Sequence, residues 1–136
     1  MIKREYERWC HCVSDEVLLR ELESIKNSPD MIQDAFYRHL EFGTGGLRGV
    51  LGAGTNRMNI YSIRRASIGL AKYILGIGGK RIALGYDTRI NSRLFADTAA
   101  TAFASFGIEV YMYSDPLPTL CSLMRRVSFP VMRELW

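Results

Sequence analysis

The stretch Arg81-Ile82-Ala83-Leu84-Gly85-Tyr86-Asp87-Thr88-Arg89 decides the fold class of this chain. Its first half is short and mostly apolar, which is typical of a strand covered on both faces, and its second half is a polar turn. In folds of alternating strands and helices, polar residues just beyond the carboxyl ends of strands line the ligand crevice. The stretch therefore predicts an α/β protein with Asp87, Thr88 and Arg89 at such an end.

The residues after this stretch complete a strand–helix–strand unit. Ser92 can cap a helix that Gly107 ends, and its expected core face holds Phe95, Ala99, Ala102 and Phe106. Residues 108–113 then form a second apolar run, expected to be another buried strand, and residues 114–119 form the loop after it. Strands joined by a helix in this way are expected to lie parallel in one sheet.

Three further helices are expected upstream of the first strand. Ser14 can cap the first, with Val17, Leu18, Leu22 and Ile25 facing inward. Ser28 can cap the second, which has Pro29 at its first helical position and should end near Glu41. The longest keeps helical spacing from about Ile60 to Leu75, where glycines interrupt the pattern.

The segment between the second and third of these helices is rich in glycine. Residues 42–54 contain six glycines in thirteen positions, which is too many for a stable helix or a flat strand, so loops and turns are expected. Glycines let backbone N–H groups approach an anion, and the guanidinium of Arg48 offers two parallel hydrogen bonds to it. This pattern favours a phosphate site around Arg48, although glycine-rich hairpins are often simple turns.

Composition limits the classes of protein that the chain can belong to. Its 136 residues, 48% hydrophobic and 24% charged, are those of one globular domain. No apolar run approaches the ~20 residues that span a bilayer, and the charged start does not resemble a signal peptide. We therefore expect no membrane partner and a cytoplasmic location.

The positive charge is concentrated in the middle of the chain. Residues 1–41 carry six basic and nine acidic residues, whereas residues 42–107 carry nine basic residues against only Asp87 and Asp97. Such a region attracts anions. A solvated basic face, a phosphate site and a nucleic-acid surface all remain open on charge alone, but aromatic residues are not interleaved with lysines as nucleic-acid binding favours.

Two of the three cysteines flank a histidine. Cys10, His11 and Cys12 lack the second pair of ligands that a structural zinc site needs, so we interpret them as free thiols in an exposed or half-buried stretch that leads into a helix. Metal binding by these three residues remains an alternative.

Several motifs resemble, in order and spacing, the first domain of the phosphohexomutases. Residues 41–49, Glu-Phe-Gly-Thr-Gly-Gly-Leu-Arg-Gly, look like the opening signature of phosphoglucomutases and phosphomannomutases. Residues 54–59 (Gly-Thr-Asn-Arg-Met-Asn), 85–89 (Gly-Tyr-Asp-Thr-Arg) and 91–92 (Asn-Ser) also match. The resemblance covers about residues 40–126, and the helices before it resemble the leader of the phosphoglucomutase and phosphopentomutase-like branch.

This resemblance implies an amino-terminal domain I, a three-layer α/β/α fold with a mixed, partly parallel sheet preceded by two helices. The implied organisation is a helical leader at 1–41, a partial domain I at 42–126 and an unrelated or frameshifted tail at 127–136. The family is an isomerase that acts by intramolecular phosphotransfer in carbohydrate metabolism. A phosphorylated serine donates phosphate to the sugar, and Mg²⁺ is held by an aspartate-rich loop of the second domain together with that serine.

The resemblance also assigns roles to residues of this chain. It places Arg48 in the active site, in contact with the phosphoryl group, and Thr44, Gly45 and Gly46 in the same phosphate-binding loop. Arg57, Asp87 and Arg89 match supporting positions. For Thr44, Asp87 and Arg89 a structural role accounts for the match equally well, and a turn and helix-start role accounts for Asn59.

The pattern departs from the family after Arg126. No Thr-Ala-Ser-His-Asn-Pro loop follows, and Ser122 and Ser128 lack the His-Asn-Pro that would mark a nucleophile. No Asp-Gly-Asp-Gly-Asp loop is present either, so we assign neither nucleophile nor metal to this chain. We expect the 136-residue chain to be inactive alone and to bind a hexose phosphate or bisphosphate weakly.

Two further expectations follow from the same departure. A stand-alone phosphosugar-binding or regulatory module is the alternative function. An incomplete sheet is expected to expose strand edges and apolar surface, which favours self-association.

Overall fold

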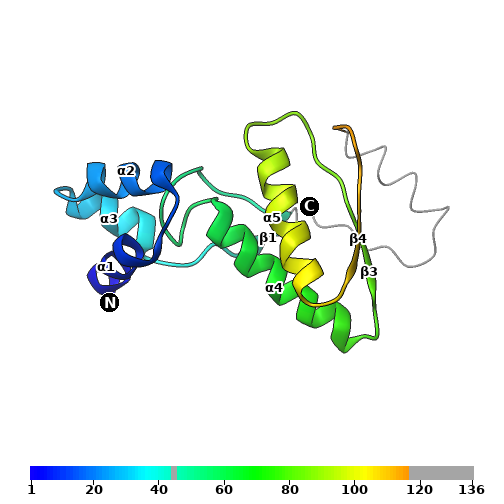
Figure 1. Ribbon diagram of the computed structural model, residues 1–136. Helices are drawn as coiled ribbons and strands as arrows, with labels where there is room; N and C mark the ends of the chain where they lie inside the picture. The colour runs from blue at the N-terminus through cyan, green and yellow to red at the C-terminus, as the bar shows by residue number, and fades with distance from the viewer. Residues whose placement is uncertain (44–45, 117–136) are drawn as a thin grey trace. The chain divides into compact units, whose positions relative to one another are not determined.

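The computed structural model describes residues 1–43 and 46–116. Along them lie α1 (Ile2–Cys12), α2 (Glu16–Ile25), α3 (Pro29–Phe36), β1 (Phe42–Gly43), β2 (Gly46–Leu47), α4 (Ile60–Gly76), β3 (Arg81–Leu84), α5 (Ser92–Ser105) and β4 (Glu109–Met112) (Figure 1). The chain divides into two compact units, one ending at Ser62 and the other beginning at Ile63. Within the described ranges, every helix is too short or too polar to cross a membrane.

Some expectations fall outside the described ranges. They concern Thr44 and Gly45, the end of the 114–119 loop, Ser122 and Ser128, and the 127–136 tail.

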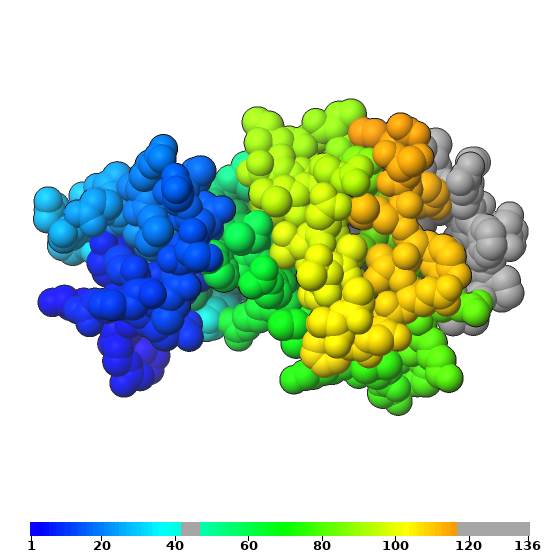
Figure 2. All heavy atoms as spheres, viewed as in Figure 1, coloured from blue at the N-terminus to red at the C-terminus, as the bar shows by residue number. Residues whose placement is uncertain are grey.

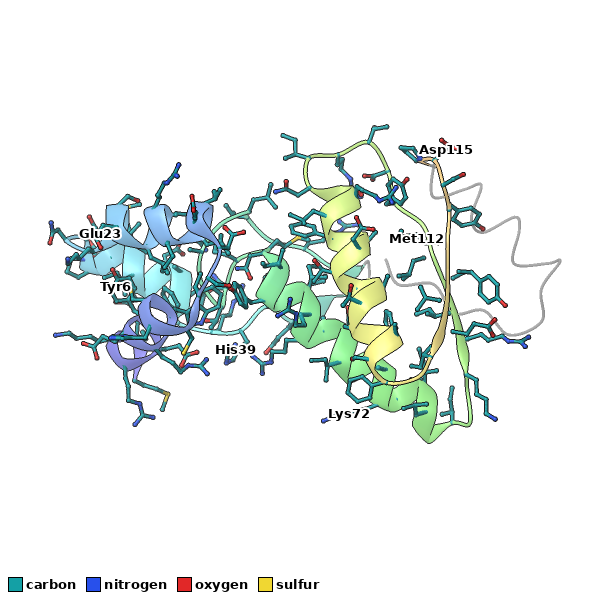
Figure 3. The ribbon with its side chains drawn as sticks, in the orientation of Figure 1. Tyr6, Glu23, His39, Lys72, Met112 and Asp115 are labelled. Carbon is teal, nitrogen blue, oxygen red and sulfur yellow. The ribbon has the colours of Figure 1, made fainter. Side chains whose placement is uncertain are left out.

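The first unit is a cluster of short helices around an aromatic core. Tyr6 and Trp9 of α1 meet the ring of Phe36 of α3 edge to face, with ring centroids 5.8 and 5.6 Å away. The Tyr6 hydroxyl donates a hydrogen bond to the Leu22 carbonyl of α2 at 2.9 Å, which joins the first two helices (Figure 3). Burial and, to a smaller extent, a hydrogen bond with Cys10 together raise the pKa of Tyr6 to about 12.

Helix α1 is not predicted by the apolar periodicity of the sequence. Ile2, Tyr6, Trp9 and Val13 lie three or four residues apart and pack into the core, but charged residues surround them in the sequence. Cys10 and Cys12 are free thiols in a half-buried to exposed stretch, as expected, but residues 10–12 end α1 instead of leading into a helix. Among the described residues, no group of three His, Cys, Asp or Glu side chains is placed to hold a metal ion.

Caps and ends of the next helices differ from the expectation. Asp15, not Ser14, caps α2, since its carboxylate accepts the Leu18 N–H at 3.0 Å. Val17 is 70% exposed and does not face inward, whereas Leu18, Leu22 and Ile25 are buried. Ser28 precedes α3 without a side-chain cap, and α3 ends at Phe36 rather than near Glu41.

The second unit confirms the α/β prediction. β3 and β4 pair in parallel with Arg81 opposite Glu109 and Leu84 opposite Met112, and α5 connects them. Residues of α5 and β4 form one continuous surface (Figure 2). The core between sheet and helices consists of Ala71, Ile74, Ile82, Leu84, Ala99, Phe103 and Ile108.

Three details of this unit differ from the sequence-based expectation. Asn91, in the left-handed region with φ 64°, precedes α5 in the cap position expected for Ser92. Phe103 is completely buried and fills the core face expected to hold Phe106, which is only partly buried. β4 alternates between exposed and partly buried residues and is not a fully buried strand, because only one of its faces meets the core.

Candidate functional site

The opening signature folds as a tight antiparallel hairpin. Phe42 pairs with Leu47 and Gly43 with Gly46 across β1 and β2. Gly46, assigned to the phosphate loop, is therefore the first residue of β2, and Arg48 follows the end of that strand. Arg48 thus comes directly after the two paired strands of the signature.

The side chain of Arg48 is exposed and has no hydrogen bond or ion pair with any residue that the structure describes. Arg57, in contrast, forms an ion pair with Asp34 and is only 16% exposed. A guanidinium without a carboxylate partner can offer its paired N–H groups to a phosphate. Arg48 therefore has the accessibility that a phosphate-contacting residue needs.

The loop after Arg48 closes on itself. The Met58 N–H donates to the Val50 carbonyl at 2.8 Å, and the Gly52 N–H donates to the Met58 carbonyl at 3.2 Å. These two bonds hold residues 50–52, at the start of the loop, beside Met58 at its end. Residues 50–58 therefore form a loop whose two ends are joined by backbone hydrogen bonds.

Asn59 holds this loop and starts α4 with the same side chain. Its Nδ2 donates to the carbonyls of Gly52 at 2.7 Å and Gly54 at 3.0 Å. Its Oδ1 accepts the N–H groups of Tyr61 at 3.1 Å and Ser62 at 3.0 Å, in the manner of an N-cap. Asn59 is 3% exposed, so these bonds satisfy polar groups that water does not reach.

Arg57 attaches the loop to α3. Besides its ion pair with the Asp34 carboxylate, its Nη1 donates to the Asp34 carbonyl at 3.4 Å. Next to it, the side chain of Asn56 donates to the same carbonyl at 3.0 Å and accepts from Arg38 at 3.1 Å. The Arg57 guanidinium is thus occupied by α3, which gives it a structural role in this unit.

The remaining predicted residues lie in the second unit, at the carboxyl end of β3. The Asp87 carboxylate accepts the Arg89 backbone N–H at 3.0 Å and the Arg89 Nε at 2.6 Å. Burial acts to raise the pKa of Asp87, but the hydrogen bonds from Arg89 and Ser92 outweigh it, so the pKa lies below its usual value. Asp87 and Arg89 therefore form a local charged turn.

A second polar network at this end was not anticipated from the sequence. Arg93 Nη1 donates to the Tyr86 hydroxyl at 2.8 Å, and this hydroxyl donates to the Ser114 carbonyl at 2.7 Å. The network joins the residues after both strands to the first turn of α5. A tyrosine at the end of an apolar strand is the signal that could have pointed to it, because a buried Tyr hydroxyl needs a partner.

Glu21 is the other residue that sequence reasoning missed. Its carboxylate accepts the Ala53 N–H at 2.9 Å, across 32 residues of sequence. The available signal was its position on α2, three residues after Leu18 and four before Ile25, both of which face the core. A carboxylate at the edge of an apolar face is expected to have a specific partner.

Comparison with known proteins identifies the family. The model of "Phosphoglucomutase/phosphomannomutase, alpha/beta/alpha domain I" matches residues 39–126. The phosphopentomutase of Pongo abelii is 32% identical over 130 residues, covering 87% of this chain and 21% of the relative. The phosphoglucomutase of Staphylococcus epidermidis is 34% identical over 101 residues, covering 74% of this chain and 18% of the relative.

The chain spans about a fifth of the length of the curated relatives that it matches. No solved structure matches it significantly. The family model covers most of the chain and agrees with the resemblance carried by the glycine-rich signature, the 54–59 segment and the strand–turn motif at 85–89. The chain belongs to the phosphoglucomutase/phosphomannomutase family.

Proposed function

We propose that this chain provides the phosphate-contacting loop of a phosphohexomutase, with Arg48 binding the phosphoryl group of a sugar phosphate. The observation that carries the proposal is the exposed Arg48 guanidinium, without a partner among the described residues and directly after a glycine-rich hairpin. Charge-assisted, bidentate hydrogen bonds to phosphate are the interaction that such a guanidinium makes best. Thr44, Gly45 and Gly46 would surround the same anion.

We further propose that the 136-residue polypeptide, by itself, binds the sugar phosphate without isomerising it. Phosphoryl transfer needs a positioned nucleophile and cationic groups that neutralise the transferred phosphoryl group. Its sequence contains no Ser-His-Asn-Pro and no Asp-Gly-Asp-Gly-Asp segment, so Arg48 would act without those partners. We therefore expect this polypeptide, when it is assayed alone, to bind the sugar phosphate without turnover.

Calorimetric titration with glucose 1,6-bisphosphate tests the binding proposal. Arg48→Gln removes the charged donor and should weaken binding about 10- to 100-fold, the usual effect of losing hydrogen bonds to a charged group. Arg65→Gln, which removes an exposed arginine of α4, is the matched control and should bind like the unchanged protein. Equal binding by the two variants would contradict the role of Arg48.

Parallel measurements address the sugar and the absence of turnover. The relatives include a phosphopentomutase and a phosphoglucomutase, so a pentose bisphosphate should be titrated beside the hexose compound. A coupled assay for conversion of glucose 1-phosphate to glucose 6-phosphate should show no rate above background. Turnover that disappears in Arg48→Gln would refute the proposal of binding without catalysis.

Ion pairing supports a phosphate ligand over nucleic acid. At least four of the nine basic residues between 42 and 107 pair with carboxylates, which reduces the free positive charge that a nucleic acid would meet: Arg57 with Asp34, Arg81 with Glu109, Arg89 with Asp87 and Arg93 with Asp97. Strongly salt-dependent binding to DNA would overturn this preference.

A further inference from the structure

The glycine loop is packed against the leader helices as closely as its backbone allows. Gly52 has φ 146°, and a Cβ atom there would lie 2.3 Å from Oε1 of Glu21. Gly54 has φ 130°, and a Cβ atom there would lie 2.5 Å from the Ala35 carbonyl oxygen of α3. Both glycines therefore serve the contact with α2 and α3, in addition to any approach by an anion.

Glu21 is the residue of α2 that makes this contact. Its Oε2 accepts the Ala53 N–H at 2.9 Å, between the two glycines. Side chain and backbone bonds of Thr55 and Asn56 add further links to the leader: the Thr55 hydroxyl donates to the Arg38 carbonyl at 2.7 Å, and the Asn56 N–H donates to the Ala35 carbonyl at 2.9 Å. The leader and the loop are one structural unit.

The contact at Glu21 reaches Arg48 through a short series of backbone hydrogen bonds. Gly52, adjacent to Ala53, donates to the Met58 carbonyl, and the Met58 N–H donates to the Val50 carbonyl. Val50 lies two residues after Arg48. A shift of Gly52 and Ala53 away from α2 would therefore move the backbone segment after β2 that carries the Arg48 guanidinium.

We propose that Glu21 is a positioning residue for the phosphate site, acting on Arg48 through the loop of residues 50–58. The helical leader is then a functional part of the site rather than an appendage. This inference rests on the proposed binding of sugar phosphate by Arg48. A guanidinium held within a narrow range of positions binds an anion more tightly than one that must be ordered on binding.

Amide hydrogen exchange in the full 136-residue chain tests the structural half of the proposal. Glu21→Ala removes the acceptor, so exchange at the Ala53 and Met58 amides should accelerate about tenfold or more. Glu21→Gln keeps a neutral acceptor, so its exchange rates at these amides should lie between those of the unchanged protein and those of Glu21→Ala. Glu23→Ala is the matched control, because Glu23 is exposed on the same helix and pairs only with Lys26 in the described residues (Figure 3).

Amides of Leu22 and Ile25 report whether α2 itself stays folded in these variants. Unchanged exchange at Ala53 in Glu21→Ala, or the same change in Glu23→Ala, would overturn the positioning role. If α2 unfolds in Glu21→Ala, the exchange rate of the Ala53 amide in Glu21→Gln tests the positioning role instead. An unchanged rate in that variant would overturn it.

Titration with glucose 1,6-bisphosphate tests the functional half. Glu21→Ala should weaken binding several-fold without touching Arg48, and Glu21→Gln should restore part of the affinity. If the unchanged protein binds and Glu21→Ala binds equally well, only the positioning role is refuted. If the unchanged protein does not bind, the proposed function fails with it, whatever the exchange data show.

Discussion

The unit that ends at Ser62 and the strand–helix unit that begins at Ile63 both have an apolar core, but they differ in the hydrogen bonds that their side chains make. In the first, polar side chains bond to backbone far away in sequence, as between Glu21 and Ala53, 32 residues apart, or Thr55 and Arg38, 17 apart. In the second, the core is aliphatic and alanine-rich around Phe103, and most side-chain bonds are local, as between Asp87 and Arg89.

This difference matters because the two kinds of contact respond differently to substitution. Apolar burial is non-directional and depends on volume, so it sets how stable a unit is. Hydrogen bonds from buried side chains are directional, so they set which conformation a loop adopts. We therefore expect changes in the second unit to affect stability first, and changes in the first unit to affect the geometry of the loop after Arg48.

The largest effect should come from the core of the second unit. Phe103→Ala removes a side chain that is 0% exposed and should lower the free energy of unfolding by about 3 to 5 kcal/mol. Leu94→Ala, on the same helix but 48% exposed, should change it by less than about 1 kcal/mol. Urea denaturation followed by circular dichroism measures both, and similar losses in the two variants would break the contrast between the units.

An intermediate effect is expected at the centre of the first unit. Asn59→Ala leaves the carbonyls of Gly52 and Gly54 and the amide of Ser62 without their partner, which should cost about 2 to 4 kcal/mol in total. Asn27→Ala removes an exposed asparagine and is the control.

Amide exchange distinguishes the two units in this experiment. Amides of residues 50–58 should lose protection in Asn59→Ala, while those of β3 and β4 keep theirs. Equal loss of protection in both units would show that they unfold together and that the comparison does not hold.

The smallest effect should be a pH-dependent one at Asp87. Its pKa is lowered in the folded protein, so its contribution to stability is complete above the pKa of the unfolded state and is lost as the pH falls through the folded value. Asp87→Asn should cost about 1 kcal/mol at neutral pH, and the difference from the unchanged protein should shrink in acid.

Asp97→Asn gives the comparison for this prediction. The Asp97 carboxylate pairs with Arg93 on the exposed surface of α5, where solvent screens the pair and its contribution to stability is small. Denaturation of both variants at a series of pH values is the measurement. If the free energy of unfolding of Asp87→Asn differed from that of the unchanged protein by the same amount down to acid pH, the charge of the Asp87 carboxylate would not contribute to stability.

Periodic patterns predicted most of the second unit correctly. The apolar run that became β3 and the helical spacing that became α4 and α5 are properties of neighbouring residues, so they can be read locally. The core residues were predicted wrongly where two similar residues could face the core and tertiary packing determines which one does. Phe103 of α5, not Phe106, is the phenylalanine that is fully buried. Helix α1 was not predicted because charged residues separate its core-facing residues Ile2, Tyr6 and Trp9 in the sequence.

The roles assigned to the site residues stay predictions. Arg48 could be found from the sequence because a lone arginine in a glycine-rich segment is a local pattern, and the structure leaves it exposed. Glu21 and Asn59 could not be assigned their partners, since those partners lie on other segments or depend on how the loop closes.

By itself, then, the sequence determined the α/β class, the glycine-rich segment around Arg48 and the family, because short-range periodicity and motif spacing are sufficient for these. Only the tertiary structure decided that Arg57 is occupied by Asp34, that Gly52 and Gly54 face the leader helices, and that Glu21 holds the loop. The physical reason is that a hydrogen bond between distant residues depends on the position and direction of both groups, and these are fixed only when the helices have packed.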